Sequence, residues 1–234
     1  GEDGTMQGLL EMADVAYVGA GVTGAAVGMD KGIFKDVMVA NSIPVVESVL
    51  VLRSEIETDM NAVIDKVDAL GYPVFVKPAN MGSSVGVSKA HTVDEVTAAT
   101  EQALTYDEWI VFEEAITGRE IEVAVLGSLE PEASVAGEIV PAHEFYDYED
   151  KYLGDSAQLL VPAPLSDAAA IEVRQLAIRV FQALRGEGLA RVDFFYEENG
   201  RGFLCNEINT MPGFTPISMY PKLWLASGLS YPEL

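Results

Sequence analysis

The sequence of 234 residues predicts an α+β protein with two lobes. The pattern of its first half predicts strands separated by helices, and that of its second half predicts antiparallel strands followed by a long helix and a hairpin. Apolar residues recur at helical spacing between Ser166 and Leu184, which predicts the long helix. Asn199-Gly200 between two apolar runs predicts the hairpin. We place the boundary between the lobes near Thr117-Gly118.

The composition excludes several classes of function. The formal net charge is −23, so little basic surface is available for phosphate contacts and nucleic acid is not expected as a partner. No apolar run is long enough to span a bilayer and no signal peptide opens the sequence, so no membrane association is expected. Cys205 is the only cysteine, which excludes a disulfide framework and fits a reducing, cytoplasmic setting.

The first residues read as the end of another domain. Turn residues open the chain, Thr5 is the expected cap of a helix reaching Ala13, and a short strand is expected over residues 15–19. A glycine-punctuated turn and helix should follow over 21–35. A domain rarely begins on a turn, so we expect residues 1–29 to be the end of a truncated N-terminal α/β domain.

Residues 30–117 and 118–234 would then form the central and C-terminal lobes. Apolar runs predict their strands, at 48–52, 74–78, 109–116, 120–126 and 134–140. Helical spacing and cap residues predict their helices, at 59–70, 93–104, 166–184 and 218–226. Thr92 with Glu95 three residues later is the expected capping box of the second of these helices.

The hairpin near the C-terminus carries the strongest chemical signal. Glu207 and Asn209 lie two residues apart, so on a strand both side chains share one face. Asp193 should lie opposite Glu207, a pairing that requires an odd-numbered loop such as Asn199-Gly200-Arg201 with Gly200 left-handed. Hard oxygen donors on one face suit Mg2+. Taken alone, the hairpin favours an ordinary structure with acidic residues on its water-exposed face, and the rest of the chain reverses that preference.

A second signal follows the strand that ends at Lys77. The loop from Ala79 to Lys89 contains Gly82, Ser83 and further small residues, whose backbone N–H groups could surround phosphate oxygens. It is not a Walker A loop, because the Gly-Lys-Ser/Thr ending and the following helix are absent. Taken alone, the loop favours a flexible Gly-Ser hairpin loop. Lys77 just before it favours phosphate binding.

Four separated motifs together resemble one family, the D-alanine–D-alanine ligases of the ATP-grasp superfamily. They are the VKP run with the GSSVG loop, FEE at 112–114, RVD at 191–193, and NEINTMPG at 206–213. The opening GEDGT and the tyrosine-rich segment at 143–152 fit the same family, so the resemblance covers nearly the whole chain. It implies the ATP-grasp fold, with ATP sandwiched between the two lobes.

The resemblance also implies ligands for ATP and metal. Lys31, Lys77 and Lys151 match lysines that contact the phosphates, and Glu120 matches the carboxylate that binds the ribose. Glu113 to Ile116, with the backbone of Glu114 and Ile116, match the strand beside the adenine. Asp193, Glu207 and Asn209 match the ligands of two Mg2+ ions, with Mn2+ as a possible substitute.

The implied reaction is ATP-dependent ligation of two D-alanine molecules through D-alanyl phosphate, for peptidoglycan precursors. Arg191 and the Gly213 N–H match the groups that hold the tetrahedral oxyanion. Ser218 and the Met219 backbone match the clamp on the second substrate. Ser83 and Tyr152 match a pair that positions substrate and closes the site. The family implies a homodimer for the full-length protein.

Alternatives remain open at this point. Ligation of D-alanine to D-lactate or D-serine uses the same fold, although the tyrosine segment here is similar to the D-alanine type. The family's N-terminal domain supplies a glutamate for the first D-alanine, and this chain does not contain it. A truncated fragment that binds ATP without turnover is therefore the other alternative.

Overall fold

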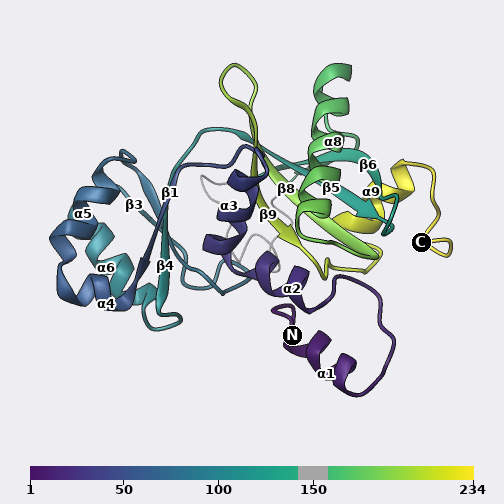
Figure 1. The fold of residues 1–234 in the computed structure, drawn as a ribbon. Coiled ribbons are helices and arrows are strands. Elements are labelled where there is room, and N and C mark those ends of the chain that lie inside the picture. The colour runs from purple at the N-terminus through teal and green to yellow at the C-terminus, as the bar shows by residue number, and fades with distance from the viewer. Residues whose placement is uncertain (142–157) are drawn as a thin grey trace. The chain divides into compact units, whose positions relative to one another are not determined.

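The computed structural model describes residues 1–141 and 158–234 (Figure 1). The chain divides into two compact units, of which unit 1 comprises residues 1–29, 34–45 and 118–234, and unit 2 comprises residues 30–33 and 46–117. Helices and antiparallel sheets build both units, which confirms the predicted α+β class. The predicted three-part division at 29/30 and 117/118 stays a prediction. Within the described ranges, no helix has the length and apolarity needed to cross a membrane.

Unit 2 is a four-stranded antiparallel sheet covered on one face by helices. The strand order is β1 (Ser48–Leu52), β4 (Trp109–Glu114), β2 (Val74–Pro78) and β3 (Ser88–Ala90). Helices α4 (Arg53–Thr58), α5 (Met60–Asp68) and α6 (Val93–Ala103) lie on one face of the sheet (Figure 1). Their buried residues form one core with alternate strand residues such as Val74, Val76 and Phe112. Lys77 and Glu113 therefore lie on the face opposite that core.

Unit 1 contains a five-stranded antiparallel sheet with different partners on its two faces. The order is β7 (Gln158–Leu160), β6 (Glu132–Val140), β5 (Arg119–Leu126), β8 (Leu189–Glu197) and β9 (Gly202–Asn209). The long helix α8 (Asp167–Ala183) packs its apolar stripe on one face, where Ile121, Val192 and Phe194 are buried. Helix α9 (Met219–Ala226) packs on Ala124 and Ile139 of the other face.

The β8–β9 hairpin pairs Asp193 with Glu207 as predicted, but by a different route. Four residues, 198–201, separate the strands. The pairing is continuous from Glu197↔Gly202 to Phe194↔Cys205. The register then shifts by one residue between Phe194 and Asp193. A β-bulge in β9 thus supplies the extra residue, and the predicted three-residue loop does not. The left-handed glycine of this turn is Gly202, with φ +80°, and the assignment to Gly200 was wrong.

The N-terminal residues correct three further expectations. Helix α1 (Thr5–Met12) begins after Gly4, and Thr5 is not its cap, because the Asp3 carboxylate accepts the Thr5 N–H at 3.1 Å. The strand predicted over 15–19 is absent from this described segment. The helix predicted over 21–35 is divided into α2 (Val22–Met29) and α3 (Lys31–Ala40). Asp30 starts α3, since its Oδ1 accepts the Gly32 and Ile33 N–H groups at 3.0 and 2.9 Å.

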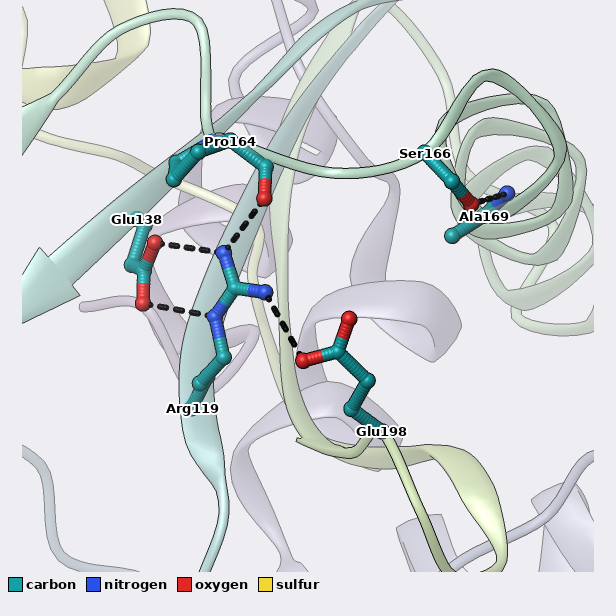
Figure 2. Close-up of polar contacts among 6 residues, drawn as sticks. All are labelled: Arg119, Glu138, Pro164, Ser166, Ala169 and Glu198. Carbon is teal, nitrogen blue, oxygen red and sulfur yellow. Dashed lines mark hydrogen bonds and ion pairs between the residues drawn. The ribbon is translucent and has the colours of Figure 1, made fainter.

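The predicted caps of two other helices are confirmed. The Ser166 hydroxyl accepts the Ala169 N–H at 3.2 Å at the start of α8 (Figure 2). The Thr92 hydroxyl accepts the Glu95 N–H at 3.3 Å at the start of α6. In a capping box the Glu95 carboxylate would accept the Thr92 N–H. It accepts the His91 N–H instead, at 2.7 Å, one residue earlier.

Arg119 joins three segments of unit 1 (Figure 2). Its Nε and Nη2 donate to the two carboxylate oxygens of Glu138 at 2.8 and 2.7 Å, and Nη2 also donates to the Pro164 carbonyl at 3.0 Å. Glu198 lies 3.7 Å from Nη1. The Glu138 side chain is only 8% exposed, so this forked contact compensates a carboxylate that water scarcely reaches.

Replacement of Arg119 by alanine should lower the free energy of unfolding by about 1–3 kcal/mol, because Glu138 would be left buried without its cation. Urea denaturation at pH 7 measures this. Arg201→Ala is the matched control, since its side chain is 41% exposed and its pair with Glu197 should contribute less than about 1 kcal/mol. Equal effects of the two substitutions would contradict this interpretation of the Arg119 contact.

Candidate functional site

Polar side chains from three neighbouring strands gather on the face of the unit 1 sheet opposite α8. The register pairs Asp193 with Glu207 on β9 and with Glu122 on β5, and it pairs Arg191 with Asn209. Directly paired residues share a face, and Arg191 and Asp193 share it because they lie two apart. The structure therefore brings the predicted residues Arg191, Asp193, Glu207 and Asn209 together on one surface.

Arg191 makes the shortest contacts in this group. Its Nε and Nη2 donate to the two carboxylate oxygens of Asp193 at 2.7 and 2.6 Å. Its Nε also lies 3.0 Å from Oε2 of Glu122. Burial by itself would lower the pKa of the guanidinium, but the charges of Asp193 and Glu122 outweigh it, and the pKa is raised well above its ordinary value. Arg191 is therefore a permanent cation among carboxylates.

The donor set fits a divalent cation in its chemistry. Asp193 and Glu207 supply carboxylate oxygens and Asn209 an amide oxygen, which are the hard donors that Mg2+ prefers. Asn209 Nδ2 already donates to Asp193 at 3.0 Å, so the amide and the carboxylate are adjacent. Among the residues that the structure describes, no group of three or more His, Cys, Asp or Glu side chains is arranged as a metal site. The candidate set has two carboxylates and relies on the amide as its third donor.

Two carboxylates near this surface were not predicted from the sequence. Glu122 is 5% exposed, and the Glu-Ile-Glu alternation of its strand, which puts it on the face of Glu120, was the available signal. Glu2 accepts the Met211 N–H at 3.3 Å, 209 residues away in sequence. Burial and the charge of Glu207 raise the pKa of Glu2, although the Met211 contact and Arg191 oppose this. No local pattern could have predicted that long-range contact.

The loop after β9 places Gly213 beside Ser218. A Cβ added to Gly213 would meet the Ser218 hydroxyl oxygen at 2.9 Å, so any side chain here would displace Ser218. Ser218 precedes α9, but its hydroxyl accepts the Thr215 N–H at 3.2 Å and makes no cap bond to the helix. Met219 is the first residue of α9 and is buried. Three predicted site residues are thus adjacent at one turn.

Lys77 and Glu113 form a buried ion pair on the face of the unit 2 sheet opposite its helices. Their side chains are 12% and 4% exposed, and the Lys77 ammonium also lies 5.4 Å from the centre of the Phe75 ring. Glu114 follows on β4, where its carboxylate accepts the Glu47 N–H at 2.8 Å. Ile116 lies two residues beyond β4. The pair combines a cation and a carboxylate at the two predicted nucleotide-binding strands of this unit.

The glycine–serine loop is held by Lys31. The Lys31 N–H donates to the Ala79 carbonyl at 3.0 Å, and its ammonium donates to the Met81 carbonyl at 2.5 Å. Ser83 and Ser84 have φ of +52° and +59°, a left-handed conformation that non-glycine residues adopt at an energetic cost. Such strain occurs often at functional loops. The structure therefore brings two predicted phosphate-binding elements, Lys31 and the Ser83 loop, into contact.

The remaining predicted residues lie at other described positions of unit 1 or outside the described residues. Glu120 is on β5, two residues from Glu122 and opposite Phe195 of β8. Lys151 and Tyr152, with the whole segment 143–152, lie outside the residues that the structure describes. Cys205 is a buried free thiol, as expected, and burial raises its pKa.

Comparisons with known proteins place the chain in a family. Residues 37–234 match the family model described as D-ala D-ala ligase C-terminus. The whole chain is 54% identical to a D-alanine–D-alanine ligase of Heliobacterium modesticaldum and 50% identical to one of Halothermothrix orenii. It covers 64% and 68% of the lengths of these two relatives.

Solved structures agree with the sequence matches. The D-alanine–D-alanine ligase of Coxiella burnetii superposes with a TM-score of 0.84 at 40% identity, over 100% of this chain and 62% of that one. The VanG D-Ala:D-Ser ligase of Enterococcus faecalis superposes with a TM-score of 0.89 at 36% identity, over 99% of this chain and 66% of that one. The predicted ATP-grasp fold is confirmed, and the chain belongs to the D-alanine–D-alanine ligase C-terminal family.

Proposed function

We propose that the protein to which this chain belongs ligates two D-alanine molecules with ATP, through D-alanyl phosphate, to supply peptidoglycan precursors. The observation that carries the proposal is the polar face of unit 1. There a permanent cation, Arg191, lies among Asp193, Glu207 and Asn209 in a chain of this family. Transfer of a phosphoryl group to a carboxylate gathers negative charge, and these residues offer the means to balance it.

Asp193, Glu207 and Asn209 would hold the divalent metal. When bound, Mg2+ neutralises phosphate charge during phosphoryl transfer. We propose two Mg2+ ions, which Mn2+ could replace. Asp193 now shares both carboxylate oxygens with Arg191, so metal binding requires Asp193 to divide its lone pairs between the two cations.

Residues of unit 2 would bind the nucleotide. Lys77 and Lys31 would contact phosphate oxygens, and the backbone near Glu114 and Ile116 would contact the adenine beside Glu113. Glu120 of unit 1 would bind the ribose. The pairing of Lys77 with Glu113 keeps the ammonium fixed on the sheet before a phosphate arrives.

The ligation step would use Arg191 and the Gly213 loop. An acyl phosphate is attacked by the second amine through a tetrahedral oxyanion, which Arg191 and the Gly213 N–H would stabilise. Ser218 and the Met219 N–H would hold the carboxylate of the second substrate, and the contact between Gly213 and Ser218 would keep these two subsites adjacent. Ser83, with Tyr152 and Lys151 of the segment outside the described residues, would position substrate and exclude water.

We propose a cytoplasmic location, because the nucleotide and the amino-acid substrates are found there, and a homodimer for the full-length protein. ATP and D-alanine are the proposed small-molecule partners. D-serine as second substrate is the specific alternative, because the VanG protein of Enterococcus faecalis, which shares the fold, is a D-Ala:D-Ser ligase.

Phosphate release from ATP tests the proposed activity. The chain is supplied with ATP, Mg2+ and D-alanine, alone or with D-serine or D-lactate, and inorganic phosphate and the ligated product are measured. Release with D-alanine alone supports the proposal. Release that requires D-serine or D-lactate overturns the choice of second substrate, and ATP binding without release under any condition supports a nucleotide-binding fragment.

Glu207→Gln should weaken metal binding without unfolding the protein, because it removes one ligand charge and preserves the shape of the side chain. Loss of a charged contact of about 1.5–3 kcal/mol predicts about 10–100-fold weaker Mn2+ binding, measured by electron paramagnetic resonance titration. Glu197→Gln at the turn end of the paired strand is the matched control, since that carboxylate contacts Arg201 of the turn. Unchanged Mn2+ affinity of Glu207→Gln would refute the metal assignment.

Lys77→Met should weaken ATP binding by about 10–100-fold, measured by calorimetry, because one charged phosphate contact is lost. Lys66→Met is the control in the same unit, since Lys66 pairs with Glu55 on the exposed helical side. The substitution also removes the Lys77 ammonium from the buried Glu113 carboxylate, so thermal unfolding must be followed in parallel. Equal ATP affinity of the folded Lys77→Met and unmodified chains contradicts the assignment.

A further inference from the structure

Glu122 is a buried carboxylate on the candidate polar face with no part in the proposed reaction. It lies on β5 directly opposite Asp193 of β8, and its side chain is 7% exposed. Burial of an ionised carboxylate opposes folding unless cations and donors compensate it, and an apolar side chain of similar size often stabilises such a position more. The position of Glu122 therefore requires an explanation beyond stability.

Glu122 forms an ion pair with Arg191. Its Oε2 lies 3.0 Å from Arg191 Nε, on the side of the guanidinium nearest the Arg191 backbone. Asp193 contacts the same Nε at 2.7 Å and also Nη2 at 2.6 Å. The one Nε–H hydrogen is donated to Asp193, and Glu122 Oε2 lies at ion-pair distance from the same nitrogen. Two carboxylates on adjacent strands thus face one guanidinium at Nε.

Asp193 has competing demands on its carboxylate oxygens. In the proposed function Asp193 is a metal ligand, and it already accepts the Asn209 amide at 3.0 Å. Each oxygen of an ionised carboxylate offers about two lone-pair directions, so a bound cation weakens the hold of Asp193 on Arg191. A second carboxylate at Nε would retain the guanidinium during that exchange, and its terminal N–H groups could then donate to substrate.

We propose that Glu122 is the positioning residue for Arg191, anchoring Nε so that Asp193 can turn to the metal while the guanidinium stays aimed at the reacting oxyanion. This inference rests on the proposed function, since it assigns Asp193 to the metal and Arg191 to the oxyanion. It assigns Glu122 no contact with the metal or with substrate.

The first test follows the Arg191 Nε–H directly and needs no turnover. Its 15N–1H resonance is assigned from its loss in Arg191→Lys, and Mg2+ with ATP is then added. In the unchanged chain the resonance should persist. In Glu122→Gln it should be lost to exchange once Mg2+ and ATP are present. A resonance that persists equally in Glu122→Gln overturns the proposal.

Metal affinity separates a positioning residue from a ligand. Glu122→Gln should bind Mn2+ as tightly as the unchanged chain, whereas Glu207→Gln should not. A loss in Glu122→Gln equal to that of Glu207→Gln would make Glu122 a metal ligand and overturn the proposal. If both variants bind Mn2+ with the affinity of the unchanged chain, the metal assignment is wrong. The Arg191 resonance then still tests the contact between Glu122 and Arg191.

Kinetics provide the third readout where the protein turns over. Glu122→Gln should lower kcat by about 10–100-fold with little change in the KM for ATP, as is typical of residues that orient a functional group. In an Arg191→Lys background, the same substitution should have no further effect, because it acts only through Arg191. Additive effects of the two substitutions overturn the proposal.

Two variants control for folding. Glu138→Gln replaces a comparably buried carboxylate that pairs with Arg119 on the other face of the sheet, and it should leave kcat and the Arg191 resonance unchanged. Glu122→Asp preserves the charge at a shorter reach and should restore part of the lost rate. If Glu122→Gln does not fold, the resonance and rate of Glu122→Asp decide the question, and values identical to those of the unchanged chain refute the anchor.

Discussion

Arg191 is the cation around which the polar face of unit 1 is arranged. The side chains of Glu122, Asp193 and Glu207 would repel one another on three adjacent strands, because like charges at cross-strand distance are destabilising. A guanidinium held at 2.6–3.0 Å from two of them offsets that repulsion. The same cation would then be available to an anionic intermediate, so the residue that makes the face compatible with folding is also the one proposed for the reaction.

The two faces of the unit 1 sheet separate stability from chemistry. Val192 and Phe194 alternate with Arg191 and Asp193 on β8, so each strand residue belongs either to the α8 core or to the polar face. The α8 face must exclude water to stabilise the fold, whereas the opposite face does so where α9 packs on Ala124 and Ile139. The polar face can therefore collect charges that would be unfavourable in a core, because the apolar packing beneath them holds the backbone rigid.

Unit 2 follows the same division on a smaller sheet. Val74, Val76 and Phe112 pack against its helices, and Lys77 and Glu113 pair on the opposite face. The Ser83 loop has left-handed serines, a conformation that stays populated only where surrounding contacts impose it, and the two bonds from Lys31 supply such contacts. Both units thus place the candidate site residues on the sheet face that lacks their main helical core.

Local periodicity in the sequence was enough to determine the α+β class, most strands of both sheets and the pairing of Asp193 with Glu207. Those features depend on neighbours in the chain, where spacing of two or of three to four decides which side chains share a face. The three-residue strand β7 was not predicted. Periodicity could not predict the β-bulge, because a loop of odd length and a bulge produce the same pairing. It could not predict the contact of Glu2 with Met211 or that of Glu122 with Arg191 either. Only the tertiary structure decides them, since they join residues far apart in the sequence through a register and a fold that no local pattern encodes.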